Sequence, residues 1–145
     1  MDKKYKSKKG LVYLNQYHVI FWPKYRQKVL VGDIEKDLKE IFFEVANENE
    51  VEIKALEIMA DHVHMFISFD PRQPLHGLIR LFKGRSSRIL RDKYPELKSR
   101  IPSLWTRSYF CCTIGNISEE TVLQYIENQK NTWERNDYYA YRRKN

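Results

Sequence analysis

Apolar and polar residues alternate along several short stretches of this chain, and between these stretches apolar residues recur at helical spacing. Alternation with a period of two is typical of a strand with one buried face, whereas apolar residues three and four positions apart indicate an amphipathic helix. We therefore expect strands over residues 11–22, 51–59, 62–69 and 104–114, and helices over residues 33–49, 74–93 and 118–133. The resulting order of elements is β-α-β-β-α-β-α.

Local signals set the limits of these elements. Pro23 ends the first strand, and Asp33 is expected to cap the first helix at its N-terminus. Within residues 51–59 the alternation shifts by one position after Ala55, which indicates a β-bulge. The corner at residues 60–61 joins two strands as a hairpin, and Ser118 is expected to cap the last helix.

Four strands with two crossover helices predict an α+β fold, the ferredoxin-like or RRM-like plait. This fold is a four-stranded antiparallel sheet with helices on one face, here followed by a C-terminal helix. The length of 145 residues fits a single domain over residues 1–145. The second sheet face stays open unless another segment covers it, and nucleic-acid-binding proteins of this topology use that face as a platform.

The charge of the chain favours a polyanionic partner. Lys and Arg number 26 against 19 Asp and Glu, which gives a net charge of +7. The basic residues at the two ends are explained equally well as solvated tails. No apolar run is long enough to cross a bilayer, and Cys111 and Cys112 are sequence neighbours with poor geometry for a disulfide bond. We therefore expect a cytoplasmic protein, without a membrane partner.

Two histidines provide the first candidate chemistry. In a strand, His62 and His64 point to one face, while Val63, Met65 and Ile67 point to the other. Two imidazoles on one sheet face are candidate metal ligands, although such a pair also arises by chance. Because two imidazoles are too few for a closed site, an ion there needs a third ligand and leaves positions for substrate.

The last predicted helix provides the second set of candidate catalytic residues. Tyr125 and Gln129 are four positions apart, so they lie one turn from each other at the edge of that helix's apolar stripe. The amide oxygen of Gln129 would complete a mixed nitrogen and oxygen ligand set that suits Mg²⁺ or Mn²⁺. A tyrosine in this position, taken alone, is most often a partly buried core residue.

These motifs together resemble one family. His62-Val63-His64 followed by Tyr125-Ile126-Glu127-Asn128-Gln129 resembles the single-tyrosine, TnpA-type transposases of the HUH endonuclease superfamily, from the smallest bacterial insertion sequences. The resemblance includes residues 17–26 (YHVIFWPKYR), 82–88 (FKGRSSR) and 102–110 (PSLWTRSYF), and it extends over roughly residues 10–131. In this order, the combination is far more specific than the histidine pair alone.

The resemblance implies a mechanism and a set of partners. His62, His64 and Gln129 would hold a divalent metal, Mg²⁺ or Mn²⁺, and Tyr125 would attack single-stranded DNA to form a 5′-phosphotyrosine bond. The substrate of such transposases is single-stranded DNA with hairpins at the ends of the element. A homodimer is implied, with Tyr125 acting within one subunit or across two, in the cytoplasm of a bacterial or archaeal cell at the nucleoid.

Basic residues near the first strand and along the second helix are the expected DNA-binding surface, unless they form an ordinary solvated helix face. They are Lys24, Arg26, Arg80, Lys83, Arg85 and Arg88. His18 is expected to be structural and His76 to be a surface residue. Two other interpretations stay open: a non-catalytic nucleic-acid-binding module that stacks bases on sheet aromatics, and a domesticated relative that cuts host repeat hairpins. A relaxase or replication initiator is disfavoured, because those usually carry further domains.

Overall fold

The computed structural model describes residues 5–114. The predicted helix over residues 118–133, with Tyr125 and Gln129, lies outside these residues. In chain order the elements are β1 (Lys6–Lys8), β2 (Leu11–Tyr13), β3 (Gln16–Phe21), the 3₁₀ turn η1 (Lys24–Arg26), α1 (Gly32–Glu48), β4 (Glu52–Met59), β5 (His62–Ser68), α2 (Leu75–Lys93), α3 (Pro95–Arg100) and β6 (Phe110–Thr113).

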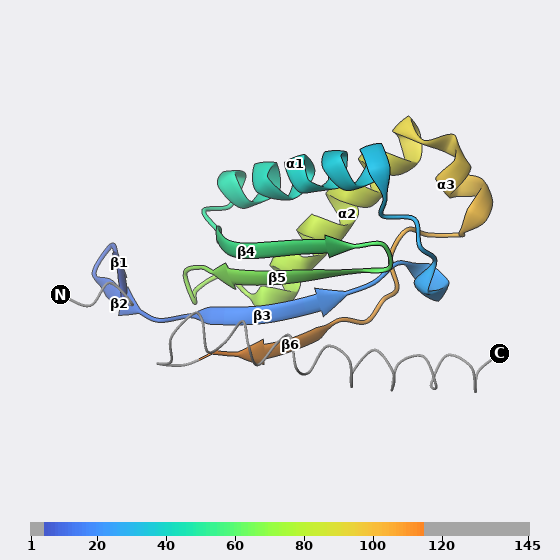
Figure 1. The fold of residues 1–145 in the computed structure, drawn as a ribbon. Helices are drawn as coiled ribbons and strands as arrows, with labels where there is room; N and C mark the ends of the chain where they lie inside the picture. The colour runs from blue at the N-terminus through green and yellow to red at the C-terminus, as the bar shows by residue number, and fades with distance from the viewer. Residues whose placement is uncertain (1–4, 115–145) are drawn as a thin grey trace.

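The main sheet has four antiparallel strands in the order β4-β5-β3-β6. Helices α1 and α2 lie on the same side of this sheet (Figure 1). The arrangement confirms the predicted α+β fold and the pairing of β4 with β5 as a hairpin. Among residues 5–114, no helix is both long and apolar enough to span a membrane.

The hydrophobic core lies between the sheet and these two helices. Phe21 of β3 and Met65 of β5 are completely buried there. Phe42 of α1 meets Phe82 of α2 edge to face, with ring centroids 5.5 Å apart, and Phe21 meets Trp105 at 4.9 Å. Because aromatic pairs in this geometry stabilise a core beyond the area they bury, they fix the sheet against the helices.

The first predicted strand is divided in two, so that prediction was wrong in part. Residues 11–13 pair with residues 6–8 as a separate hairpin, and β3 begins only at Gln16. The turn that joins β1 to β2 is Lys9-Gly10, with φ of 46° and 81°. Positive φ at both central residues is typical of a two-residue hairpin turn, so the Lys9-Gly10 pair was the available signal.

The last described strand is shorter than predicted. Pairing in β6 covers only Phe110–Thr113, and Trp105 makes an isolated bridge to Pro23. Backbone carbonyls at Thr106 and Ser108 accept hydrogen bonds from the Lys83 ammonium group, each at 3.0 Å. These contacts fix the segment before β6 against α2. The short helix α3 was not predicted.

Two other local predictions have clear outcomes. The bulge in β4 is confirmed, because the register shifts between Ile53 and Ala55. The cap on α1 was wrong: Val31 occupies the N-cap position, without a side-chain hydrogen bond, and Asp33 lies inside the first turn. A carboxylate in the first turn still interacts favourably with the helix dipole, so Asp33 keeps part of the expected role.

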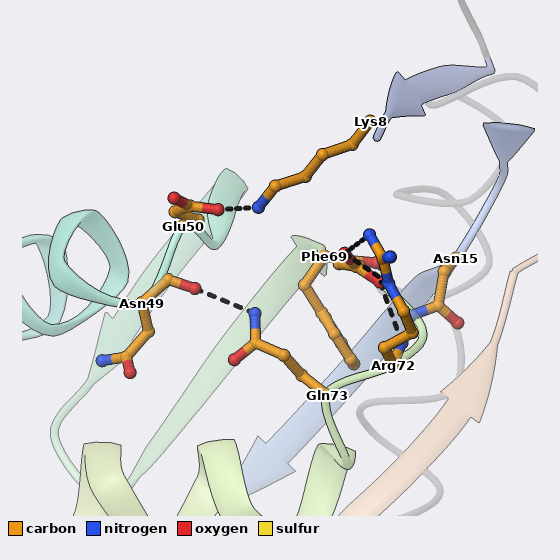
Figure 2. Close-up of polar contacts among 8 residues, drawn as sticks. Lys8, Asn15, Asn49, Glu50, Phe69, Arg72 and Gln73 are labelled. Atoms are coloured by element: carbon orange, nitrogen blue, oxygen red, sulfur yellow. Dashed lines mark hydrogen bonds and ion pairs between the residues drawn. The ribbon is translucent and has the colours of Figure 1, made fainter. Parts of the chain in front are cut away.

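The turn after β5 is fixed to two other connections (Figure 2). The Asp70 carboxylate accepts hydrogen bonds from the Arg72 guanidinium, the shortest at 2.6 Å, and these bonds lower the pKa of Asp70 to about 2. Gln73 donates to the Asn49 carbonyl at the end of α1, and Asn15 donates to the Phe69 carbonyl. These contacts hold the C-terminal end of β5 in place.

Candidate active site on the sheet face

Two histidines of β5 are the centre of the candidate site. His62 and His64 lie on the sheet face away from the helices, because Val63 and Met65 alternate with them into the core. The two imidazole ring centroids are 4.8 Å apart, and the ring planes are inclined at 59°. The structure thus brings the predicted pair together.

This face is buried rather than open. His62 and His64 are 3% and 4% exposed, respectively. Apolar side chains share the face: Ile20 lies directly across the register from His64, and Phe66 packs with Ile114 in a second, smaller cluster. The second sheet face is therefore not open at the histidine pair, and apolar residues lie on both faces of the sheet.

A third imidazole, that of His18 on β3, lies on the same face. Its ring centroid is 5.6 Å from that of His64 and 6.5 Å from that of Phe110. Burial lowers the pKa of His18 to about 4, while a contact with the Met65 backbone acts in the opposite direction. His18 is therefore an uncharged imidazole at neutral pH, close to the histidine pair.

The histidine pair fits part of a metal site. Imidazole nitrogens bind first-row divalent ions, and two rings this close on one face can donate to the same ion. Within residues 5–114, no group of three or more His, Cys, Asp and Glu side chains is placed to hold a metal. A site here needs a further ligand, and the predicted one, Gln129, lies outside the described residues, as does the predicted nucleophile Tyr125.

A carboxylate at the corner between β4 and β5 contacts the first histidine. Asp61 Oδ1 is 2.8 Å from His62 Nδ1, and Asp61 Oδ2 accepts a hydrogen bond of 3.1 Å from Arg26 Nη2. Burial would raise the pKa of Asp61, but the hydrogen bond with His62 and the charge of Arg26 together lower it. Sequence analysis assigned no role to Asp61, although a carboxylate next to a candidate metal-binding histidine is the relevant signal.

The predicted DNA-binding residues fall into two groups. Arg80 and Arg88 are exposed and lie eight positions apart on α2, so they share one face of the helix. The others are half-buried and have partners within the protein. Arg85 makes a bidentate ion pair with Glu48, at 2.7 and 3.2 Å, and the Lys24 ammonium lies 5.5 Å from the centroid of the Tyr25 ring.

Lys83 is enclosed by backbone carbonyls and aromatic rings. Besides its two backbone acceptors, the ammonium nitrogen lies 5.6 Å from the centroid of the Phe21 ring and 5.5 Å from that of the Tyr109 ring. Burial lowers the pKa of Lys83 to about 8. These contacts connect α2 to the segment before β6, so the residue has a structural role whether or not it also contacts DNA.

Comparisons with known proteins agree with one another. Residues 11–129 match the family described as "Transposase IS200 like". The chain is 36% identical over 126 residues to the ISDra2 transposase TnpA of Deinococcus radiodurans, covering 86% of this chain and 90% of that protein. It is 28% identical over 116 residues to the transposase for insertion sequence element IS200 of Salmonella typhimurium, covering 79% and 76% respectively.

Solved structures show the same fold. A provisionally assigned transposase from Deinococcus radiodurans R1 superposes with a TM-score of 0.70 at 35% identity, over 86% of this chain and 97% of that one. A REP-associated tyrosine transposase bound to a REP hairpin superposes with a TM-score of 0.59 over 88% of this chain and 74% of that one. At 14% identity, the second likeness supports the fold alone.

Proposed function

The chain belongs to the family of IS200-like transposases, and on this premise we propose that it cleaves and rejoins single-stranded DNA at the ends of a mobile element. The reaction proposed is a metal-dependent transesterification with Tyr125 as the nucleophile. The observation that carries the proposal is the pair of buried imidazoles on β5, with ring centroids 4.8 Å apart, in a chain of this family.

His62 and His64 would hold a divalent ion, Mg²⁺ or Mn²⁺, with Gln129 as the proposed third ligand. Such an ion, when bound, supplies a Lewis acid that stabilises charge on the oxygens of the scissile phosphate. The sheet contributes rigidity: both histidines belong to a central strand that is hydrogen-bonded on both sides, so their backbone positions are fixed before substrate arrives.

In the proposed first step, the phenol oxygen of Tyr125 forms a bond to phosphorus and the bond to the 3′-oxygen breaks. The products are a 5′-phosphotyrosine and a free 3′-hydroxyl group. Because the phosphotyrosine keeps the phosphodiester energy, a 3′-hydroxyl from another DNA end can attack it and restore a continuous strand. No nucleotide triphosphate is needed.

The proposed partners are single-stranded DNA with hairpin ends and a second copy of the chain. The second copy is needed because a subunit with one nucleophilic tyrosine cleaves one DNA end at a time. The exposed pair Arg80 and Arg88 supports a backbone-contacting role for α2. We place this activity in the cytoplasm of a bacterial or archaeal cell, at the nucleoid. The alternative, a non-catalytic stacking module, would bind DNA without a divalent ion and would form no covalent adduct with it.

The test uses the full chain with labelled single-stranded DNA from the two flanks of its own coding sequence, in Mg²⁺ or Mn²⁺. We expect a protein–DNA adduct that survives denaturation. Tyr125→Phe should abolish the adduct and retain DNA binding, and His64→Ala should abolish it as well. Tyr109→Phe is the matched control. The Tyr109 hydroxyl contacts His76 and is not the proposed nucleophile, so the Tyr109→Phe variant should retain the adduct. An adduct formed by Tyr125→Phe would show that the nucleophile is another residue.

A further inference from the structure

The turn after β3 has an unfavourable backbone conformation at two successive residues. Tyr25 and Arg26 have φ of 58° and 51°, in the left-handed region that residues other than glycine rarely adopt. Backbone strain of this kind persists only where surrounding contacts impose it, and it is concentrated at functional sites. The contacts of this turn therefore indicate which side chain the strained conformation positions.

Backbone hydrogen bonds hold the turn on both sides. Lys24 N donates to the Leu104 carbonyl at 2.9 Å, and Arg26 N donates to the Pro23 carbonyl at 2.9 Å. Further along the same connection, Leu30 N donates to the Ala60 carbonyl at 3.0 Å. This last bond places the connection beside the corner between β4 and β5, where Asp61 lies.

Arg26 is the residue that the turn buries. Tyr25 is 44% exposed, so enclosing its ring does not explain the strained conformation. The side chain of Arg26 is only 13% exposed, and its Nη2 lies 3.1 Å from Asp61 Oδ2. The other oxygen of the same carboxylate, Oδ1, is 2.8 Å from Nδ1 of His62. One carboxylate thus connects the guanidinium to the imidazole.

This contact determines which nitrogen of His62 carries the proton. A carboxylate oxygen accepts a hydrogen bond, so Nδ1 must be the protonated nitrogen in neutral His62. The electron pair of the ring then lies on Nε2, at the opposite side of the imidazole. A hydrogen bond from Nδ1 to a carboxylate is also the arrangement that orients metal-binding histidines and increases their basicity.

We propose that Arg26 and Asp61 are positioning residues for a divalent-cation site, which fix the tautomer and the ring orientation of His62. The inference rests on the proposed function, because it assumes that His62 binds the cation. Arg26 holds Asp61 Oδ2, and Asp61 in turn holds Nδ1–H of His62. Arg26 therefore acts on the metal site through two contacts, in place of the DNA-backbone contact expected from sequence.

The test measures the tautomer and the cation affinity separately, in the full chain without DNA. Long-range ¹H–¹⁵N correlations of histidine-labelled protein report which nitrogen of His62 is protonated. Electron paramagnetic resonance of free Mn²⁺ gives the dissociation constant for Mn²⁺ alone. We expect Asp61→Ala to lose the Nδ1–H tautomer and to weaken Mn²⁺ binding by about 10- to 100-fold, the usual effect of removing an outer-shell partner.

Arg26→Gln should change the His62 tautomer and the Mn²⁺ dissociation constant in the same direction as Asp61→Ala, by a smaller factor. Arg26→Lys keeps the positive charge, so it should lie between Arg26→Gln and the parent. The matched control is Arg72→Gln, which disrupts the Asp70–Arg72 pair just beyond the opposite end of β5 and should change neither readout (Figure 2). Asp61→Val fills more of the space of the side chain and also lacks an acceptor for His62 Nδ1–H, so it replaces Asp61→Ala if the alanine variant fails to fold.

An unchanged His62 tautomer and an unchanged Mn²⁺ dissociation constant in Asp61→Ala, or in Asp61→Val where that variant is used, would overturn the inference. So would a parent protein that binds no Mn²⁺ through His62. Failure of the proposed function looks different: the parent would bind Mn²⁺ with the Nδ1–H tautomer and yet form no adduct with DNA.

Discussion

Burial of His18 on the sheet face should make the stability of the protein depend on pH. The pKa of His18 falls from 6.5 in the unfolded chain to about 4 in the fold, because burial disfavours its charged form. The unfolded state therefore binds a proton that the folded state does not bind between these two values. This contribution to stability is present in full above the unfolded value of 6.5 and is lost progressively as the pH falls toward about 4.

The magnitude follows from the two pKa values. At about pH 4.5, the protonated unfolded state is favoured by about 2.5 kcal/mol relative to neutral pH through this single group. His18→Gln replaces the imidazole with an amide that does not titrate, so the variant should lose that much less stability on acidification. The His18→Gln substitution should therefore change how the free energy of unfolding depends on pH, in addition to any change at a single pH.

The assay is urea unfolding of the parent and His18→Gln at about pH 7.5 and about pH 4.5, monitored by tryptophan fluorescence. Phe66→Leu is the control, because Phe66 lies across the register from His18 and has no titrating group. It should lower stability by about 1 kcal/mol at both pH values. Equal losses of stability on acidification in the parent and in His18→Gln would show that His18 does not cause the pH dependence.

Three further predictions concern α2. Gly84→Ala should raise the free energy of unfolding by about 0.5–1 kcal/mol, since a Cβ there meets nothing within 4 Å, and a urea midpoint checks this. Ser86→Ala should lower it by about 1–3 kcal/mol, because Trp105 Nε1 loses its buried acceptor at 2.9 Å; the same titration measures the loss. Replacing both Arg80 and Arg88 with Gln should weaken single-stranded DNA binding and reduce its salt slope by about 1.4, as fluorescence anisotropy at several salt concentrations would report.

The elements that sequence predicts well are those whose pattern is local. Alternation along residues 62–68 needs only the side chains of one strand, and it placed His62 and His64 on one face with Met65 on the other. The bulge in β4 was likewise visible as a shift of the alternation. The apolar stripes of the two long helices predicted their limits to within one or two residues.

Features that depend on distant partners were missed. The Lys83 ammonium binds carbonyls that lie 23 and 25 positions further along the chain, so its contacts with the segment before β6 could not be seen in a local pattern. The contact of Arg26 with Asp61 joins residues 35 positions apart, so no local pattern could have indicated it. The burial of the histidine face also escaped prediction, because alternation gives the two faces of a strand but not what covers each of them.

The proposed DNA cleavage depends above all on a divalent ion held by His62 and His64. Electron spin echo envelope modulation of the Mn²⁺-loaded protein measures this directly, because directly coordinated imidazole nitrogens modulate the echo. We expect nitrogen modulation in the parent that disappears in the His62→Ala, His64→Ala double variant. Bound Mn²⁺ without nitrogen modulation in the parent, or modulation of the same depth in the double variant, would contradict it.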